Sequence, residues 1–491
     1  MLRNKFTGIF CVLLTCVLCI SSCGIITLNT KDTPVTTETE AVTSTPDTET
    51  DPPETVESAP PPIEIPDPKD WEIRRDEAQA MLDKQISISF EDKILLIVDS
   101  AGTLSDPLIE NNIYSEAVYE RYELLSEKYG MKISVSAAER ESLYDEYIKT
   151  VNGGNTYCDM LSVPLRDTAR FIQSGYIQNL RSLPFFKASG DYSIPSFDAS
   201  RSLYDDVWFS VGYSTLAPDD LGCLYFNRTL ASNADIDLYS LVGHGEFTIE
   251  KYLEMLTVTG GSVVCNENSD LYLTSLELSD ARFFETGYGT GISLSSDVFH
   301  AAVSAVTDIL SVLHKGLVSV PEGKTSSDIF AEGETLFRIG TLNEIEEISK
   351  QKLFFGVLPM PKTDLESDHK TPVSDMTAAL MITRNTANTE VCSVTLSALN
   401  AISYKWLLDS AGLHYVNYYV PDIGSADMIR IITENPVLDF SASARHLTSW
   451  YDALIYDAMK KKLEDPAVDL SGIFTAASLR SFKADLNKYY N

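Results

Sequence analysis

An alternation of strand and helix patterns between residues 93 and 163 constrains the fold more than any other feature of this sequence. Residues 93–98 are almost continuously apolar, which is typical of a strand covered on both faces. Residues 113–129 carry apolar side chains at helical spacing, and Gly130 stands where a glycine cap would end that helix. Strand, helix and strand patterns follow at 131–136, 139–149 and 157–163. This βαβαβ order predicts a parallel sheet with helices on both faces.

A second series of elements follows. Residues 222–226 form a strand pattern, and Thr248 is placed to cap a helix whose apolar face begins at Ile249. Residues 295–316 repeat the helical spacing. No internal repeat of 20–50 residues is apparent, which argues against solenoids and propellers.

Length and charge narrow the class of protein. A chain of 491 residues can bury two domain-sized cores, because single cores stop growing near roughly 250–300 residues. The formal charge of −33 argues against nucleic acid as a partner and against electrostatic docking on anionic lipid, since both require a basic surface. We therefore expect an acidic protein with two domains.

The first residues predict the location of the protein. Arg3 and Lys5 precede an apolar run at 9–20, which is too short to span a bilayer comfortably but right for a signal peptide. The run ends in Ile20-Ser21-Ser22-Cys23-Gly24, which resembles a bacterial lipobox. We expect residues 1–22 to be removed and Cys23 to be diacylated. The alternative is an ordinary signal peptide with an incidental cysteine.

The segment after the lipobox has the composition of a stalk. Residues 24–70 contain 11 Thr, 9 Pro, 11 acidic residues and no aromatic residue. Such a segment cannot bury enough apolar surface to offset its ordering entropy, so we expect residues 23–70 to be a disordered, lipid-anchored stalk.

Four cysteines remain after the signal peptide and the lipidation site are set aside. They are Cys158, Cys223, Cys265 and Cys392, and none is close to another in sequence. Three disulfide pairings are possible, but we expect four free thiols that pack as small apolar side chains.

Four segments of the chain resemble the family 1 extracellular solute-binding proteins, which are the sugar-receptor lipoproteins of ABC importers. The family's third strand and the helix after it resemble residues 159–163 and 171–180, and its first lobe crossing resembles residues 224–230. Its Phe-x-x-Gly helix resembles residues 330–337. A Gly-x-x-Pro turn resembles residues 355–362, with 371–374 shortly after. The chain departs from the family at Phe247, where Trp is usual, and at Glu334-Thr335.

The resemblance implies two doubly wound α/β lobes of the type II periplasmic-binding-protein kind, with a ligand cleft between them. We expect the N-terminal lobe at 87–221 and 357–412, and the C-terminal lobe at 222–356 and 413–491. The crossings near Gly222-Cys223 and Phe355-Gly356 would act as hinges when the lobes close on ligand. The ligand would lie beyond the carboxyl ends of the strands.

No catalytic constellation stands out. The six His residues form no His-Glu-x-x-His pattern, and no Gly-x-Ser-x-Gly elbow occurs. We therefore expect a non-enzymatic receptor without metal or cofactor. A lipid-anchored surface hydrolase acting on glycans stays open as an alternative, because carboxylate pairs cannot be recognised from sequence spacing. An adhesin or scaffold is a third possibility.

The expected ligand is a sugar or oligosaccharide, whose ring faces stack on aromatic side chains. Trp208 and Tyr213 precede the first crossing, and Tyr288 lies in a glycine-rich loop. Trp450-Tyr451 resembles an aromatic pair on a late helix of some sugar receptors, although one of the two rings would serve the core. Asp159 is a candidate polar contact or the cap of a turn.

The resemblance also implies the partners and the location. We expect a monomer that binds a small solute and delivers it to the membrane subunits of an ABC importer. It would be held by its lipid alone at the outer face of the bacterial cytoplasmic membrane.

Overall fold

The structure is a computed structural model of one chain. It describes residues 68–105, 109, 111–187, 190–203, 206–258, 263–264, 285–287, 291–293, 316, 318, 320–420 and 422–438, with scattered positions between 461 and 484. The predicted signal peptide and Cys23 lie outside these residues, as does the predicted helix at 295–316 except for its last residue. In the part of the chain that the structure describes, none of the helices has the length and hydrophobicity of a membrane-spanning segment.

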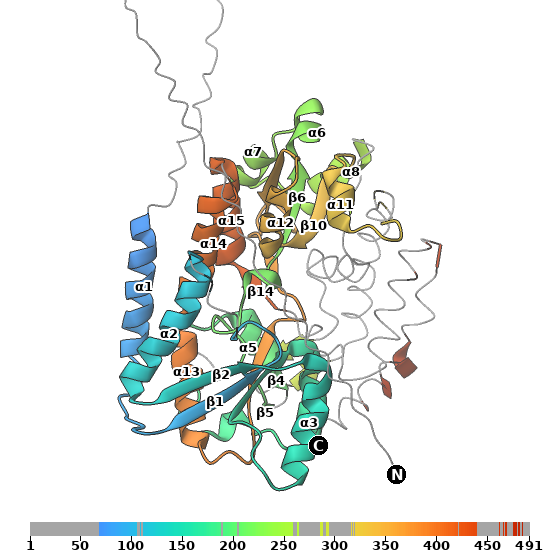
Figure 1. The fold of residues 1–491 in the computed structure, drawn as a ribbon. Helices are drawn as coiled ribbons and strands as arrows, with labels where there is room; N and C mark the ends of the chain where they lie inside the picture. Colours follow the sequence, from blue (N-terminus) through green and yellow to red (C-terminus); the bar gives the residue numbers. More distant parts are fainter. Residues whose placement is uncertain are drawn as a thin grey trace, which may run out of the picture. The chain divides into compact units, whose positions relative to one another are not determined.

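The first lobe is built on a sheet that confirms the predicted βαβαβ order (Figure 1). Its strands are β1 (Ile94–Asp99), β2 (Lys132–Ala137), β3 (Met160–Pro164) and β13 (Ala378–Ile382), in the order β13-β3-β1-β2. β1 is parallel to β2 and β3, and β13 runs antiparallel to β3. The carboxyl ends of the three parallel strands therefore meet at one edge of the sheet.

Helices cover both faces of this sheet, because right-handed crossovers in opposite directions place them on opposite sides. The helices are α2 (Ile113–Tyr129), α3 (Arg140–Asn152), α4 (Thr168–Gln173) and α13 (Thr389–Ser403), with α2 and α3 on opposite sides in Figure 1. The α2 termini follow from local chemistry. Asn112 accepts a hydrogen bond from the Ser115 amide, and Gly130 takes the left-handed φ of 62° that glycine tolerates.

The second lobe is built on a mostly antiparallel sheet. Its strands are β6 (Gly222–Asn227), β7 (Val263–Val264), β10 (Phe337–Thr341) and β11 (Phe355–Leu358), in the order β11-β6-β10-β7. β6 runs antiparallel to both of its neighbours. Helices around it are α6 (Arg228–Asn233), α7 (Leu238–Gly243), α8 (Ile249–Val258), α11 (Ser326–Ala331), α12 (Ile345–Ser349) and α15 (Ile423–Glu434). The Thr248 hydroxyl accepts a hydrogen bond from the Lys251 amide, as its predicted capping role requires.

Short elements complete the described chain. They are α5 (Pro195–Arg201), the strand pairs β4 (Ser202–Leu203) with β5 (Asp206–Val207) and β8 (Glu285–Gly287) with β9 (Gly291–Ser293), and the 3₁₀ turns η1 (Leu165–Asp167), η2 (Leu180–Ser182), η3 (Pro218–Asp220) and η4 (Leu342–Glu344).

The first two crossings between the lobes lie side by side. Leu221, just before β6, forms a bridge with Val373, and the Ser374 amide donates to the Asp220 carbonyl at 2.9 Å. A Cβ atom on Gly222 would lie 2.8 Å from Pro372 Cγ, so this approach requires glycine. The pair β12 (Thr371–Pro372) and β14 (Pro436–Val437) adds a third segment to the crossing region.

Two predicted lobe boundaries are wrong. Phe355-Gly356 is not a crossing, because β11 pairs along its length with β6 inside the second sheet. Gly356 is needed for packing, since a Cβ atom there would lie 2.4 Å from the Phe226 ring. The return to the first lobe occurs at 371–377. The boundary at 412 falls inside one continuous helix, α14 (Trp406–Tyr418), which packs on both α2 and α15.

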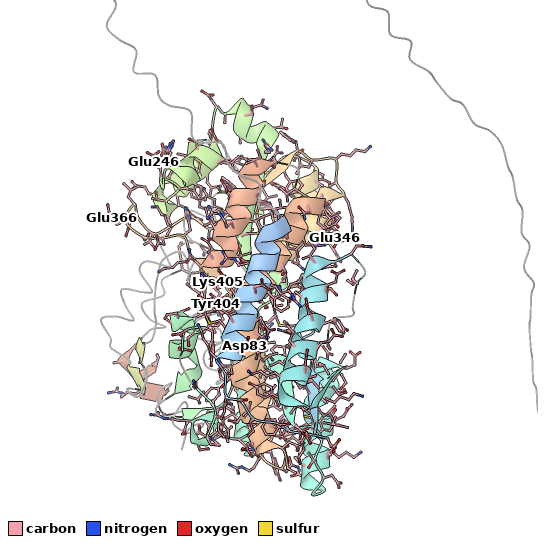
Figure 2. All side chains as sticks on the ribbon, turned by 90° about the vertical axis from the view of Figure 1, so that its left-hand side faces the viewer. Asp83, Glu246, Glu346, Glu366, Tyr404 and Lys405 are labelled. Atoms are coloured by element: carbon pink, nitrogen blue, oxygen red, sulfur yellow. The ribbon has the colours of Figure 1, made fainter. Side chains whose placement is uncertain are left out.

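A helix that the sequence analysis did not predict precedes the first strand. α1 (Pro68–Asp83) begins inside the predicted stalk and packs on α13 and α14. Figure 2 shows it in front of these helices and beside α2, with Asp83 at its C-terminal end. Ala78 and Leu82 are fully buried, and Arg74 Nε lies 2.8 Å from Asp409 Oδ2. Residues 68–70, which the sequence analysis assigned to the stalk, are therefore helical.

Candidate functional site

The edge where β1, β2 and β3 end is the candidate ligand site, because open α/β sheets bind ligands beyond the carboxyl ends of their strands. Asp99 ends β1 and is 1% exposed. Its carboxylate accepts hydrogen bonds from the amides of Leu104 at 2.9 Å and Ser105 at 2.8 Å. These hydrogen bonds fix the conformation of the loop after β1. Asp99 therefore has a structural role on one side of the candidate site.

An ion-pair network lies along the same edge. Arg140, which begins α3 after β2, places Nε 2.6 Å from Asp167 Oδ2 and Nη2 3.3 Å from Asp167 Oδ1. Arg170 Nη2 approaches the same carboxylate at 3.4 Å. Arg166 Nε lies 3.6 Å from Asp375 Oδ2 on the second crossing. The network thus joins the ends of β2 and β3 to the region where the lobes meet.

The network offers fixed but accessible hydrogen-bond donors. Hydrogen bonding to Asp167 raises the pKa of Arg140, and Asp375 adds to this effect. The three guanidinium groups stay partly exposed, while Asp375 is nearly buried. Planar guanidinium donors held by carboxylates can present their remaining N–H groups to hydroxyl or anionic groups of a solute. These residues could not be predicted from sequence patterns, because the ion pairs join positions up to 209 residues apart in the chain.

A buried carboxyl group lies in the first crossing. Asp220 is 4% exposed, and its Oδ2 accepts a hydrogen bond from the Ala217 amide at 2.8 Å. The Thr377 hydroxyl is close to the same carboxyl group but does not meet hydrogen-bond geometry. Burial raises the pKa of Asp220 to about 7. The crossing therefore contains a group that changes charge near neutral pH.

Asp159 lies at the opposite edge of the sheet. It precedes β3, so it sits at the amino end of the parallel strands. Its carboxylate accepts hydrogen bonds from the Leu96 amide at 2.9 Å, from Asn388 Nδ2 at 3.2 Å and from the Thr386 hydroxyl. These contacts favour the capping role that the sequence analysis left open over a ligand contact.

Trp208 also lies toward the amino edge, which differs from the expected position. Ser210 pairs with Leu380 in an antiparallel bridge, so Trp208 is level with Ile382. Ile382 in turn pairs with Met160, the first residue of β3. The Trp208 side chain packs partly buried against the core, and among the described residues its indole N–H finds no hydrogen-bond acceptor.

Tyr213 is farther along the same segment, toward the carboxyl edge, but its ring is in the core. It is 6% exposed and meets the Tyr404 ring edge-on at a centroid distance of 5.2 Å. Burial raises the pKa of its hydroxyl to about 12. Tyr404 is labelled in Figure 2 at the corner between α13 and α14. This packing gives Tyr213 a structural role in the conformation described here.

Three further predicted site residues, Trp450, Tyr451 and Tyr288, lie outside the described residues. The strands β8 and β9 on either side of the Tyr288 loop are described, and they pack against β4. Ligand contacts by these aromatic residues therefore stay predictions.

The predicted free thiols are confirmed where they are described. Cys158, Cys223 and Cys392 are buried and unpaired, and Cys265 lies outside the described residues. Burial raises the pKa of all three thiols, so they act as apolar core side chains rather than nucleophiles. In the described part of the chain, no three His, Cys, Asp or Glu side chains gather into a group that could hold a metal ion.

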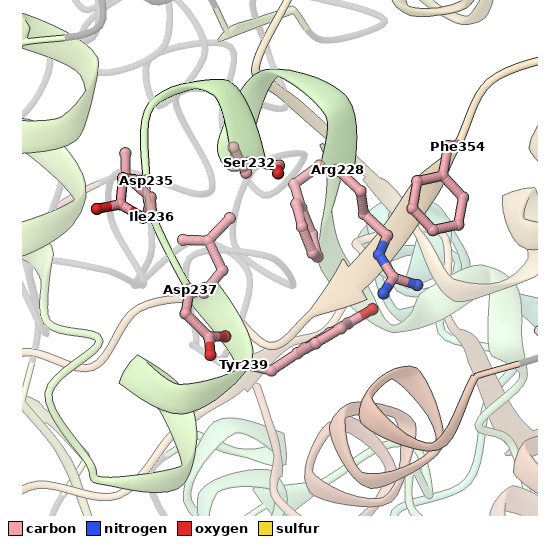
Figure 3. Close-up of a pocket in the computed structure, with 10 residues that line it drawn as sticks. Arg228, Ser232, Asp235, Ile236, Asp237, Tyr239 and Phe354 are labelled. Atoms are coloured by element: carbon pink, nitrogen blue, oxygen red, sulfur yellow. The ribbon is translucent and has the colours of Figure 1, made fainter.

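A pocket of about 370 Å³ lies away from the crossings, and the sequence analysis did not predict it (Figure 3). It is formed by the C-terminal end of β6, by α6 and α7 and the turn between them, and by Phe354 before β11. β6 begins at the first crossing, so six residues of strand place this pocket roughly 20 Å from the crossing. We call it the distal pocket.

Comparison with known proteins identifies the fold. No family model and no curated protein matches the chain. UgpB from Mycobacterium tuberculosis, solved in complex with glycerophosphocholine, is similar with a TM-score of 0.50 and 15% identity, covering 81% of this chain and 99% of that chain. The GacH receptor of Streptomyces glaucescens GLA.O, solved unliganded and with acarbose and an acarbose homolog, gives a TM-score of 0.48 and 12% identity, covering 82% and 100%. The protein has a periplasmic-binding-protein-like α/β fold.

Proposed function

We propose that this protein is an extracellular solute receptor that captures a sugar or oligosaccharide between its lobes and delivers it to an ABC importer. The observation that carries the proposal is the arrangement of the crossings. The first two crossings run side by side at the edge where the parallel strands of the first lobe end. A hinge in this position would let the lobes close over a ligand bound at that edge.

The ion-pair network supports a polar solute. Arg140, Arg166 and Arg170 are held by Asp167 and Asp375 before any ligand arrives. Donors fixed in advance lose little conformational freedom when they bind a hydroxyl-rich molecule. The fold likeness to UgpB, which was solved with glycerophosphocholine, agrees with a small, highly polar ligand.

The remaining parts of the proposal rest on the sequence. Cys23 would carry the lipid that holds the protein at the outer face of the bacterial cytoplasmic membrane. The segment from residue 24 to the start of α1 would separate the lobes from the bilayer. Membrane subunits of an ABC importer would receive the solute from a monomeric receptor that performs no chemistry on it.

A ligand screen on the purified protein tests this function. Thermal unfolding is measured against a panel of mono- and oligosaccharides and glycerophosphodiesters. A receptor saturated at about 100 times its Kd should gain roughly 2.7 kcal/mol of stability. The stabilising compound is then incubated with the protein and recovered. Recovery of intact compound supports the receptor, whereas released product would establish the hydrolase alternative.

A further inference from the structure

The distal pocket has a wall that depends on close packing. The Tyr239 ring meets Phe226 edge-on at 5.3 Å, and the Tyr239 hydroxyl lies 2.6 Å from Ser425 Oγ. Two glycines make room for this tyrosine. A Cβ atom on Gly356 would lie 2.3 Å from the Tyr239 hydroxyl oxygen, and one on Gly424 would lie 2.6 Å from its ring. Tyr239 is therefore a fixed part of the pocket wall.

The guanidinium group of Arg228 already has interaction partners in and beside the pocket. Its guanidinium carbon lies 4.2 Å from the Phe354 ring centroid and 5.5 Å from that of Tyr239. Figure 3 shows the group between these two rings. Asp422 completes an ion pair with Arg228 Nη1 at 3.3 Å. The cation of the pocket is thus balanced by a carboxylate and held by two aromatic rings.

The opposite side of the pocket carries uncompensated negative charge. Asp235 and Asp237 are both exposed there, and neither forms an ion pair with any described residue. Asp237 Oδ1 accepts a hydrogen bond from the Ser240 amide at 3.1 Å, which leaves Oδ2 available. The chain as a whole has a formal charge of −33, so an acidic partner or a second copy of this chain would be repelled. The pocket favours a cation.

An exposed aromatic side chain lines the same pocket. Phe354 belongs to the pocket wall and is 60% exposed. Aromatic residues and arginine are both enriched in protein interfaces, so an exposed aromatic ring next to an arginine favours a polypeptide partner. The stem of a lysine or arginine can pack on such rings while its charged end reaches the carboxylates.

From these contacts we propose that the distal pocket is a docking site for an arginine or lysine side chain of a partner polypeptide. The side chain enters between Asp237 and Tyr239, and the flanking residues of the partner cover Phe354. This surface is separate from the proposed ligand cleft, so it can be engaged while a solute is bound.

Saturation-transfer NMR on the full chain tests the charge preference. The probes are N-acetyl-arginine methylamide and N-acetyl-citrulline methylamide, which have similar shapes but differ in charge. We expect at least fivefold more transfer to the arginine probe. Asp235→Asn combined with Asp237→Asn should remove this difference, while the exposed Asp145→Asn leaves it unchanged. Asparagine tolerates the positive φ of Asp235 and caps helices as well as aspartate does, so the double variant should keep its fold.

A second probe tests whether the partner is a polypeptide. N-acetyl-Leu-Arg-Leu methylamide adds apolar flanks, and we expect it to bind at least tenfold more tightly than the single arginine amide. Phe354→Ala should abolish this gain. Equal transfer to the arginine and citrulline probes, or a preference that survives the double substitution, would overturn the cation site. If the leucine flanks add no affinity, polypeptide docking is refuted.

Discussion

Replacing Asp220 by asparagine should change how the stability of the protein depends on pH. The carboxyl group is buried in the first crossing, and its pKa is raised from the ordinary 3.8 to about 7 by burial. Below pH 3.8 the group is protonated in both the folded and the unfolded chain. Between pH 3.8 and 7 the unfolded chain releases the proton while the folded chain keeps it. Stability is therefore lost as pH rises across this window.

The size of the effect follows from the raised pKa. At 1.36 kcal/mol per pKa unit, the difference between 3.8 and about 7 corresponds to roughly 4 kcal/mol at pH 8, as an upper limit. In Asp220→Asn, the side-chain amide oxygen can still accept the hydrogen bond from the Ala217 backbone amide. The variant should thus avoid the cost of burying a charge without losing the existing hydrogen bond.

Urea unfolding between pH 4 and pH 8 measures this effect. The stability advantage of Asp220→Asn over the natural chain should be near zero at pH 4, grow through pH 5.5 and level off above pH 7. Asp145→Asn, on the exposed surface of α3, is the matched control and should show a constant difference from the natural chain. Parallel curves for the natural chain and Asp220→Asn over the whole range would refute the burial argument.

Three further changes have defined outcomes. Gly356→Ala should lower the free energy of unfolding by about 1–3 kcal/mol, because its methyl group meets the Phe226 ring, and an unchanged urea midpoint would contradict this packing. Arg74→Gln should lower the free energy of unfolding by about 1 kcal/mol at pH 8, because the Asp409 carboxylate loses its ion-pair partner. Burial raises the pKa of Asp409 to about 6, so the carboxyl group is protonated at pH 5 and the decrease measured there should be smaller. Cys23→Ser should prevent lipidation and leave the protein unprocessed or released to the medium, and acyl chains detected by mass spectrometry on that variant would exclude Cys23 as the anchor.

Local sequence signals were enough to predict the βαβαβ part of the first lobe. The alternation of apolar strand runs with helical spacing predicts β1, α2, β2, α3 and β3, and the glycine after α2 marks its end. These signals are readable because strand burial, helix periodicity and capping involve residues only a few positions apart. The helix α1 escaped prediction because its apolar side chains are few, and packing on α13 and α14 stabilises it instead.

The placement of functional side chains was decided only by the tertiary structure. Trp208 lies toward the amino edge of the sheet because of its pairing register with β13. Asp159 precedes β3, so it lies at the edge opposite the candidate ligand site. Arg140 meets Asp167, and Arg228 meets Asp422, only because separate elements are folded together. Periodicity along a sequence shows which residues are buried, but strand register and the packing of distant segments determine which side chains share a site.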